Sequence, residues 1–497
     1  MTRDAETEGT RQVGGGVAYN DVEPGYFEGR KLRRYAGAGS LWALGVGAVI
    51  SGDFFGWNFG LAAGGFGGLL LATVIITVMY VGLCFSIAEM SPALPHAGGA
   101  YSFARSAMGP WGGYVTGLAE NMEYVLTPAV IVVGIGGYLG AIFETPDAWA
   151  PAWWAFAYAV FVGLNVVGVE ASFRFTVAIT VLALAILGVF YVGAFLHLDL
   201  AQYAHTVEPE AGGSAFLPRG VAGIVAALPF AIWFYLAIEE LPLAAEESHD
   251  PKVDMPRGIL LGLATLVICA FATLILSAGI APGAAALGRS EEPLFEGLRT
   301  VFGAGLGTRL LALVAVAGLV ASFHTIIFAY GRQIFSLSRA GYFPRWLSRT
   351  HPERETPHVA LMVGAVLGYL VALTIHGLGP EHPVGAVLLN MAVFGAVVSY
   401  VLQMSSYILL RIRLPHIERP YRSPLGIPGA VIALSIAAVT CVALFVSDPV
   451  YQKVVIGAAV WYLLGLVYFG VWGRHQLVHA PEEAFALAAR ERSDLAR

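Results

Sequence analysis

Residues 47–58 read Gly47-Ala48-Val49-Ile50-Ser51-Gly52-Asp53-Phe54-Phe55-Gly56-Trp57-Asn58, so polar and small residues occupy the middle of a membrane-length apolar segment. Residues 231–242 read Ala231-Ile232-Trp233-Phe234-Tyr235-Leu236-Ala237-Ile238-Glu239-Glu240-Leu241-Pro242 and interrupt a second such segment. Unpaired backbone inside a bilayer is tolerated only where it lines a cavity or meets a ligand. The two stretches therefore predict two broken transmembrane helices that frame a transport site.

The composition predicts a polytopic, all-α membrane protein. The 497-residue chain is 57% hydrophobic and only 12% charged, and its mean hydropathy is +0.71, which excludes an ordinary soluble protein. A helix needs about 20 apolar residues to cross the hydrocarbon core. About twelve such spans follow, at 40–62, 67–90, 111–143, 152–169, 173–197, 220–241, 257–280, 308–336, 358–376, 384–410, 428–447 and 452–473.

The first ten spans divide into two halves of five, 40–197 and 220–410. Because five is odd, the two halves have opposite orientations in the membrane, which is an inverted repeat. Each half carries a short helical segment between its second and third spans, at Ala97–Gly109 and Pro293–Gly303. Spans eleven and twelve, over 428–473, are expected to form a packing or oligomer surface.

Tails flank the predicted transporter domain of residues 39–475. Residues 1–38 are polar and lack a signal peptide, so we expect a disordered tail there and a second tail at 476–497. If the amino terminus is cytoplasmic, most Lys and Arg residues fall in inside segments, so both termini are predicted to be cytoplasmic. The net charge of -6 gives no indication of nucleic-acid binding.

The sequence carries no pattern typical of an enzyme. Cys84, Cys269 and Cys441 all fall within apolar spans and are expected to be small buried residues. We find no zinc-binding helix motif, nucleophile elbow or phosphate-binding loop. We therefore predict no catalytic residues, no cofactor and no bound metal.

Three separated motifs resemble those of the amino acid–polyamine–organocation permeases. They are Glu89-Met90-Ser91-Pro92-Ala93-Leu94-Pro95-His96-Ala97-Gly98-Gly99-Ala100-Tyr101, Ala245-Glu246-Glu247-Ser248-His249-Asp250-Pro251 with Met255-Pro256-Arg257, and Gly331-Arg332-Gln333-Ile334-Phe335-Ser336 with Arg339-Ala340-Gly341 and Pro344. The resemblance covers about residues 36–475 and implies a leucine-transporter-like five-plus-five fold with broken helices 1 and 6 and alternating access. Residues 50–60 and 232–239 are similar to the ethanolamine permease branch.

Asp53 indicates what the first break would bind. In relatives that carry α-amino acids, this break is a run of small residues that holds the substrate carboxylate. A carboxylate side chain here repels that group and attracts an ammonium, which favours a cation such as ethanolamine. We therefore expect Ser51, Gly52, Asp53 and Phe54 to line the substrate site. The alternative is that Asp53 caps a half-helix that starts at Phe54.

Glu120 and Glu123 lie three residues apart on one face of the third span, near the middle of the bilayer. Carboxylates in the membrane interior indicate a functional role because they must face a cavity or find a partner. We expect at least one of them to meet substrate or a proton, although a protonated, hydrogen-bonded structural acid is the alternative. Tyr124 is a candidate for the substrate hydroxyl.

Glu239, in the second break, corresponds through the resemblance to a glutamate that relatives use in proton handling or gating. It is our first candidate for coupling. Glu240 departs from the pattern, in which a small residue follows the acid, and it leaves the assignment to a single residue open. Trp233 and Leu236 are placed beside the substrate by their position in this break, since an ammonium binds favourably over an aromatic ring.

Ser322 and Thr325 offer hydroxyls at i and i+3 in the eighth span. In sodium-coupled members of the fold, such hydroxyls pair with carbonyls of the first span, whereas isolated Ser and Thr more often bond their own helix. Some proton-coupled relatives place a lysine of the fifth span at this position, but residues 173–197 contain no Lys. His324 could relay protons, although a structural role is the simpler interpretation.

Arg332, Arg339, Arg345 and Arg349 form a basic group at the inner end of the eighth span. Topology and contacts with anionic lipid account for it. The nearby segment from Glu246 is expected to gate the pathway or support the structure.

Together these features predict an inner-membrane secondary transporter that imports ethanolamine or a similar small amino alcohol. Proton symport or exchange would drive it, and sodium is the other coupling ion considered. A neutral or cationic amino acid permease is the alternative, and a sensor that binds without transporting is a further one. The expected partners are the small amine, the coupling ion, the lipid bilayer and, in an oligomer, other copies of the chain.

Overall fold

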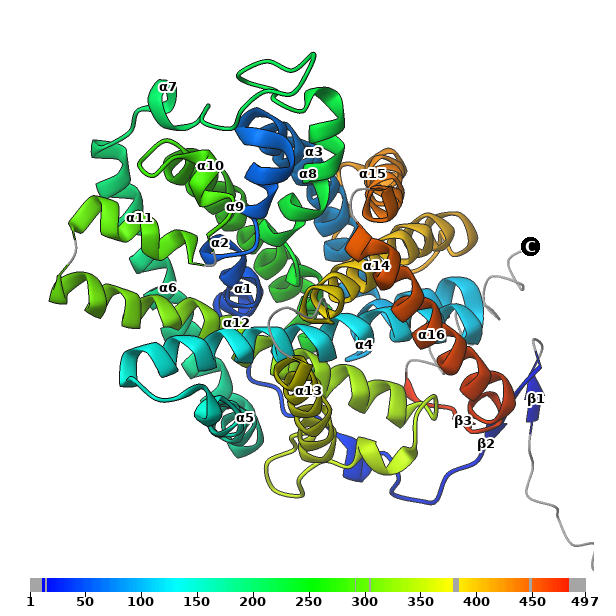
Figure 1. The fold of residues 1–497 in the computed structure, drawn as a ribbon. Coiled ribbons are helices and arrows are strands. Elements are labelled where there is room, and N and C mark those ends of the chain that lie inside the picture. Colours follow the sequence, from blue (N-terminus) through cyan, green and yellow to red (C-terminus); the bar gives the residue numbers. More distant parts are fainter. Residues whose placement is uncertain are drawn as a thin grey trace, which may run out of the picture.

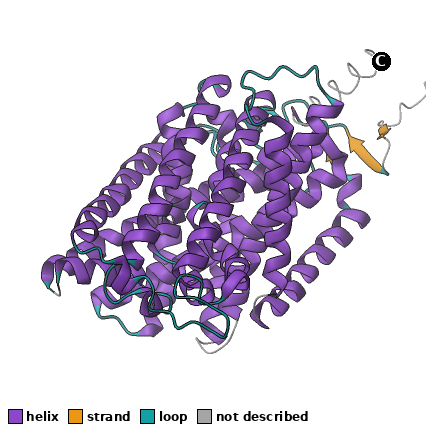
Figure 2. Cartoon of the chain, turned by 90° about the horizontal axis from the view of Figure 1, so that it is seen from above, coloured by secondary structure: helices purple, strands orange, loops and turns teal. Residues whose placement is uncertain are grey.

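The computed structural model describes residues 11–13, 16–290, 292–303, 305–378, 384–446 and 449–481. These residues form one bundle of helices, with three short strands at its edge (Figures 1 and 2). The helices are α1 (Ala38–Val49), α2 (Ser51–Phe54), α3 (Phe59–Ala93), α4 (Gly99–Phe143), α5 (Ala150–Val167), α6 (Val169–Leu196), α7 (Leu200–Tyr203), α8 (Gly220–Ala231), α9 (Pro251–Ala278), α10 (Ala284–Leu287), α11 (Pro293–Phe302), α12 (Leu306–Arg339), α13 (His358–Leu378), α14 (Val384–Arg413), α15 (Gly426–Val446) and α16 (Pro449–Val471).

This architecture confirms the predicted fold class. Ten helices in the described residues are long and apolar enough to cross a membrane. The other two expected spans are the interrupted first helix, Ala38–Phe54, which is shorter, and α12. Helices α3 and α4 each contain a kink, at Gly65 and Gly109, where φ is positive.

The first interruption lies where the sequence predicted it. Helix α2 ends at Phe54, Phe55 is fully extended with φ -161° and ψ 169°, and Gly56 follows with φ +93°. Only glycine adopts such a φ without steric cost. The next helix begins at Phe59. No helix starts at Phe54, so the suggestion that Asp53 caps such a helix is wrong.

The second interruption also lies within the predicted stretch. Helix α8 passes into a short 3₁₀ turn, Ile232–Phe234, and Ala237 then adopts a left-handed conformation with φ 83°. That conformation costs a residue with a Cβ about 1–2 kcal/mol. The chain continues as the 3₁₀ helix η4 (Ile238–Glu247). A 3₁₀ stretch of this length is uncommon and often marks a hinge.

Helix α1 lies near the centre of the bundle and packs against α6, α9 and α12 (Figure 1). Helix α4 crosses the bundle and packs against α12 and α14. The two predicted short helices are present at matching positions, as the part of α4 before Gly109 and as α11. Both interrupted segments are therefore enclosed by long helices.

The amino-terminal tail differs from the expectation of disorder over residues 1–38. Strand β1 (Arg11–Val13) pairs antiparallel with β2 (Val17–Asn20), and β2 pairs parallel with β3 (Leu477–Val478) from the carboxyl-terminal segment. Tyr19 is buried and accepts a hydrogen bond from Arg105 at 2.6 Å. Burial of an aromatic side chain supplies the energy that a polar tail otherwise lacks.

Further along, the tail joins the two broken helices. The backbone N–H groups of Tyr35 and Ala36, just before α1, donate to the carbonyl of Glu247 at 2.7 and 2.8 Å. Ala36 also forms a parallel bridge with Ser248. We call the end of the bundle that carries these contacts and the three strands the tail side, and the end that carries α10 and α11 the far side.

Candidate substrate and coupling site

The two interruptions touch each other directly. A Cβ added at Gly52 would lie 1.8 Å from the carbonyl oxygen of Trp233, so only glycine fits there. A Cβ at Gly56 would lie 3.0 Å from the indole of Trp233. Trp233 and Leu236 are both buried. The structure therefore brings Gly52 and Trp233 together, as the two apolar stretches suggested, and it buries Leu236 in the second interruption.

Ser322 links α12 to the first interruption. Its hydroxyl donates to the carbonyl of Gly47 at 2.9 Å and accepts from the backbone N–H of Ser51 at 3.1 Å. The hydroxyl of Thr325 instead contacts carbonyls of its own helix, at Ala321 and Ser322. Ser322 thus lies where a coupling residue was expected, whereas Thr325 follows the structural alternative for its hydroxyl.

Asp53 points toward α9. Its side chain is 1% exposed, and its Oδ1 accepts a hydrogen bond from the Thr273 hydroxyl at 2.9 Å. The Thr273 hydroxyl also lies 2.7 Å from that of Tyr191 on α6. Asp53 Oδ2 has no hydrogen-bond partner among the described residues. The carboxyl group therefore lies between the first interruption, α6 and α9.

Glu239 lies at the end of a chain of tyrosine hydroxyls. Tyr400 on α14 donates to Glu239 Oε1 at 2.9 Å, and its hydroxyl lies 2.8 Å from that of Tyr80 on α3. The carboxyl of Glu123 on α4 interacts electrostatically with that of Glu239, although neither Glu123 oxygen has a hydrogen-bond partner among the described residues. Two neighbouring carboxylates repel each other unless one of them carries a proton.

The other predicted acids lie around this pair. Glu120 accepts a hydrogen bond from Gln333 on α12 at 2.8 Å. Both carboxyl oxygens of Glu240 and the hydroxyl of Tyr124 are buried without a hydrogen-bond partner in the described part of the chain. Tyr124 interacts electrostatically with all four glutamates. We refer to Glu120, Glu123, Glu239 and Glu240 as the carboxyl cluster.

Among the residues that the structure describes, the carboxyl cluster lacks basic partners. Each of its members is at most 2% exposed, and within the described residues no Arg or Lys forms an ion pair with any of them. Burial of an unpaired carboxylate costs several kcal/mol, roughly, even after the protein relaxes. The arrangement can therefore bind protons or an organic cation.

A pocket lies beside the first interruption on the far side. It is lined by Phe54, Phe55, Val130, Gly134, Tyr138, Leu294, Phe295 and Leu319. Phe54 also packs against Gly318 of α12, where an added Cβ would lie 2.6 Å from the ring. Phe54 therefore forms part of the wall of a vestibule that leads toward the broken helices.

Ion pairs lie at the opposite end of the bundle, on the tail side. Arg339 forms two hydrogen bonds with Glu246, and Arg332 forms two with Glu247 at 3.1 and 2.8 Å. The Arg332 and Glu247 side chains are both fully buried. The suggestion that anionic lipid explains this basic group is therefore wrong for Arg332 and Arg339, because their guanidinium groups are buried against acids at the end of η4.

His324 has the structural role that we considered simpler. Its two ring nitrogens lie 3.2 Å from the Asn165 amide and 3.0 Å from the Ser172 hydroxyl. The rings of Phe161 and Phe175 pack against it. Both nitrogens therefore have partners from α5 and α6, and apolar rings enclose the imidazole.

Several residues of the site were missed from the sequence. They are Asn58, Tyr80, Tyr191, Thr273, Gln333 and Tyr400. Asn58 donates to the carbonyls of Leu287 and Ser290 at 2.8 Å and accepts from the Gly56 N–H at 3.1 Å, which ties the first interruption to the far side. An asparagine in an apolar segment was a usable signal, whereas single hydroxyl residues are common in such helices.

Ten membrane-length helices around two interrupted segments, with buried carboxyls between them, define a membrane protein built around an internal polar site. A family model described as amino acid permease matches residues 40–479. The chain belongs to the amino acid permease family. The predicted resemblance to the superfamily is thereby confirmed.

Individual relatives support the assignment over most of the chain. An uncharacterised transporter of Rhizobium meliloti (strain 1021) is 30% identical over 84% of this chain and 87% of its own length. The branched-chain amino acid permease BcaP of Bacillus subtilis (strain 168) is 25% identical over 90% of this chain and 94% of its own. The methylthioribose transporter of the same organism is 25% identical over 90% and 96%.

Proposed function

We propose that this permease is a secondary transporter that imports a small organic cation, with ethanolamine or a similar amino alcohol as the substrate. The observation that carries the proposal is the carboxyl cluster, in which four buried acids lack a basic partner among the described residues. A cation without its own carboxylate matches the negative electrostatic field of these acids, because they would repel a substrate carboxylate.

Within the cluster, we propose Glu123 and Glu239 as the groups that bind the substrate ammonium. Their carboxyls interact electrostatically, and neither Glu123 oxygen has a hydrogen-bond partner in the described chain. Tyr124 is proposed as the partner of the substrate hydroxyl, since its own hydroxyl is buried and unpaired. The role of Asp53 as an ammonium ligand stays a prediction. We favour Glu123 and Glu239 over it, because Asp53 already accepts a hydrogen bond from Thr273.

Transport by alternating access in a leucine-transporter-like fold is part of the proposal. The vestibule beside Phe54 would admit substrate from the far side. The ion pairs of Glu246 and Glu247 would hold the tail side closed until the two broken helices move. With the tail side as the cytoplasmic side of the inner membrane, this direction of access corresponds to import.

An amino acid permease is the second candidate, because the family model and BcaP carry that description. The methylthioribose transporter is equally similar to this chain, so relatives at this identity span different substrates. Alanine and lysine, as neutral and cationic amino acids, discriminate the two candidates. Either would compete strongly with ethanolamine only if the site accepts a substrate carboxylate.

Binding of labelled ethanolamine to the purified chain tests the proposed site. A charge-assisted hydrogen bond contributes about 1.5–3 kcal/mol, so we expect Glu123→Gln and Glu239→Gln each to weaken binding by roughly 10- to 100-fold. Glu170→Gln is the matched control, because Glu170 is an exposed acid paired with Arg174. Unchanged affinity in both cluster variants would overturn the site assignment.

Coupling is proposed to involve Glu239. A proton held by either Glu123 or Glu239 would leave when the ammonium arrives, which makes proton and substrate compete there. Glu239→Gln should therefore remove the effect of pH on substrate affinity. Persistence of that pH effect in the variant would transfer the role to Glu120 or Glu240.

A further inference from the structure

We propose that Asp53, Thr273 and Tyr191 form a second proton-binding site, separate from the carboxyl cluster, whose proton is bound together with the substrate. The inference rests on the proposed transport function and adds the site that proton symport needs. If substrate and proton compete at Glu123 and Glu239, one carboxyl pair cannot hold both at once. A separate site lets both be bound in the same conformation.

The geometry around Asp53 suits a proton. The carboxyl group is 1% exposed, Oδ1 accepts from Thr273, and Oδ2 lies free of any partner in the described residues. Because the Thr273 hydrogen is donated to Asp53, Tyr191 can only donate to the Thr273 oxygen and to the carbonyl of Cys269, 3.2 Å away. The Thr273 hydrogen thus points toward Oδ1, the Tyr191 hydrogen points toward Thr273 or Cys269, and Oδ2 is left to carry a hydrogen of its own.

The described surroundings of Asp53 contain no compensating positive charge. The ionisable groups that interact with it in the described chain are Tyr191 from α6, Cys269 from α9 and Tyr235 from the second interruption. None of these groups is cationic in any protonation state. A proton on Oδ2 removes the cost of a buried charge, whereas a metal ion requires several oxygen ligands and this carboxyl offers one free oxygen.

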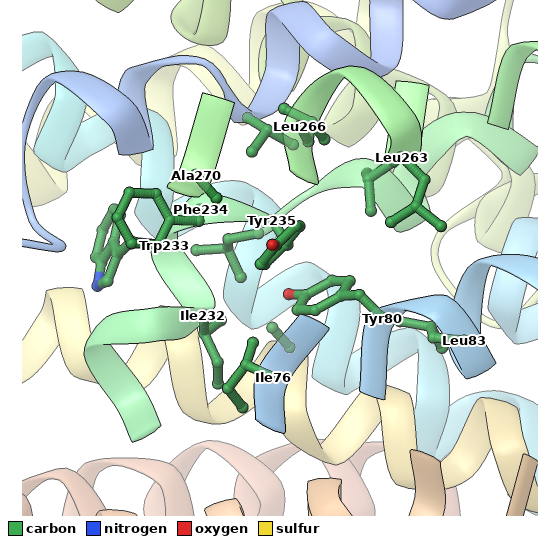
Figure 3. Close-up of a cluster of buried hydrophobic side chains, with 14 of the residues drawn as sticks. Ile76, Tyr80, Leu83, Ile232, Trp233, Phe234, Tyr235, Leu263, Leu266 and Ala270 are labelled. Atoms are coloured by element: carbon green, nitrogen blue, oxygen red, sulfur yellow. The ribbon is translucent and has the colours of Figure 1, made fainter. Parts of the chain in front are cut away.

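Asp53 and the carboxyl cluster lie on different sides of the second interruption. The partners of Asp53 come from α6 and α9, whereas those of Glu239 come from α4 and α14. Tyr235 lies between them: its ring packs on Tyr80 at a centroid distance of 4.9 Å, whereas the indole of Trp233 lies on the opposite side in Figure 3. The sites are therefore distinct but share the interrupted segment.

Movement of the first interruption would open this site. Asp53 belongs to α2, which Gly52 places against the Trp233 carbonyl, whereas Thr273 belongs to the long helix α9. Separation of the two broken helices would pull Asp53 from Thr273 and admit water. The proton on Oδ2 would then pass to water on the tail side, and a proton from water on the far side would replace it in the next cycle.

Infrared difference spectroscopy of the purified full chain tests the proposal without reference to any substrate. At neutral pH we expect a C=O stretching band of a protonated carboxyl that is lost in Asp53→Asn. We expect Thr273→Val to shift the same band, because the variant removes the hydrogen bond to Oδ1. Thr265→Val is the matched control on α9, since Thr265 bonds Leu261 and Trp42, and the band should stay in place.

A spectrum in which Asp53→Asn removes no band, or in which sodium abolishes the band at constant pH, would overturn the proposal. If Asp53→Asn fails to fold, the Thr273→Val shift decides the question alone. Proteoliposomes supply the second readout: Asp53→Asn should lose the substrate accumulation that a pH gradient drives, whereas the Thr265→Val control should keep it. A wild-type chain that moves no ethanolamine would refute the proposed function and leave the infrared result standing.

Discussion

Substitution of Gly52 by alanine should separate the two interruptions. The added Cβ would lie 1.8 Å from the Trp233 carbonyl oxygen, whereas ordinary contacts begin near 3.4 Å. The carbonyl would therefore have to retreat by more than an ångström. A flexible side chain could move that far, but this carbonyl belongs to the backbone of Trp233, inside the 3₁₀ turn Ile232–Phe234.

Overpacking of a close contact costs about 1–3 kcal/mol and occasionally more, and a clash with backbone belongs at the upper end of that range. We expect Gly52→Ala to lower the thermal unfolding temperature in detergent and to abolish uptake in liposomes. Gly134→Ala is the matched control, because an added Cβ meets nothing within 4 Å there. A Gly52→Ala chain with wild-type stability and uptake would refute the direct contact between the interruptions.

Further substitutions test other parts of the account through the unfolding temperature. Arg332→Met should destabilise the chain by about 3–5 kcal/mol, because Glu247 would be left buried without a partner, whereas the same change at the exposed Arg174 should leave the unfolding temperature nearly unchanged. Asn58→Ala should cost about 1–3 kcal/mol, since the buried carbonyl of Leu287 and the half-buried carbonyl of Ser290 lose their donor. Ala237→Gly should stabilise by about 1 kcal/mol by relieving the left-handed conformation, and a loss of stability there would contradict the strain.

The helices and their interruptions could be predicted because the bilayer imposes a strong rule on sequence. A span must be apolar over its whole length, so polar or small residues at its middle stand out, as at residues 50–58 and 235–240. The short helix before Gly109 and its counterpart α11 were predicted from short helical segments at matching positions in the two halves. These predictions depend on the pattern of residue types and not on the direction of any one side chain.

The directions of individual side chains could not be predicted. Asp53 was expected to face the substrate or cap a helix, and it faces Thr273, 220 positions along the chain. Glu239 was found from the sequence, but its partner Tyr400 was not, because a tyrosine on α14 resembles any other aromatic in an apolar span. Such partners depend on helix rotation and packing, which a single sequence does not specify.

The order in the amino-terminal tail was missed for a related reason. Its composition is that of a disordered segment, and an isolated two-stranded hairpin is at best marginally stable in water. The third strand comes from residues 477–478, and the pocket for Tyr19 is formed by residues that lie far along the chain. Contacts at this sequence separation leave no local pattern.

Uptake of labelled ethanolamine into proteoliposomes under an imposed pH gradient tests the central claim most directly, with unlabelled alanine and choline as competitors. The account predicts accumulation that follows the pH gradient and resists a large excess of alanine, because the carboxyl cluster repels a substrate carboxylate. Transport of alanine or lysine in place of ethanolamine would contradict it, and would assign the chain to the amino acid carriers of its family.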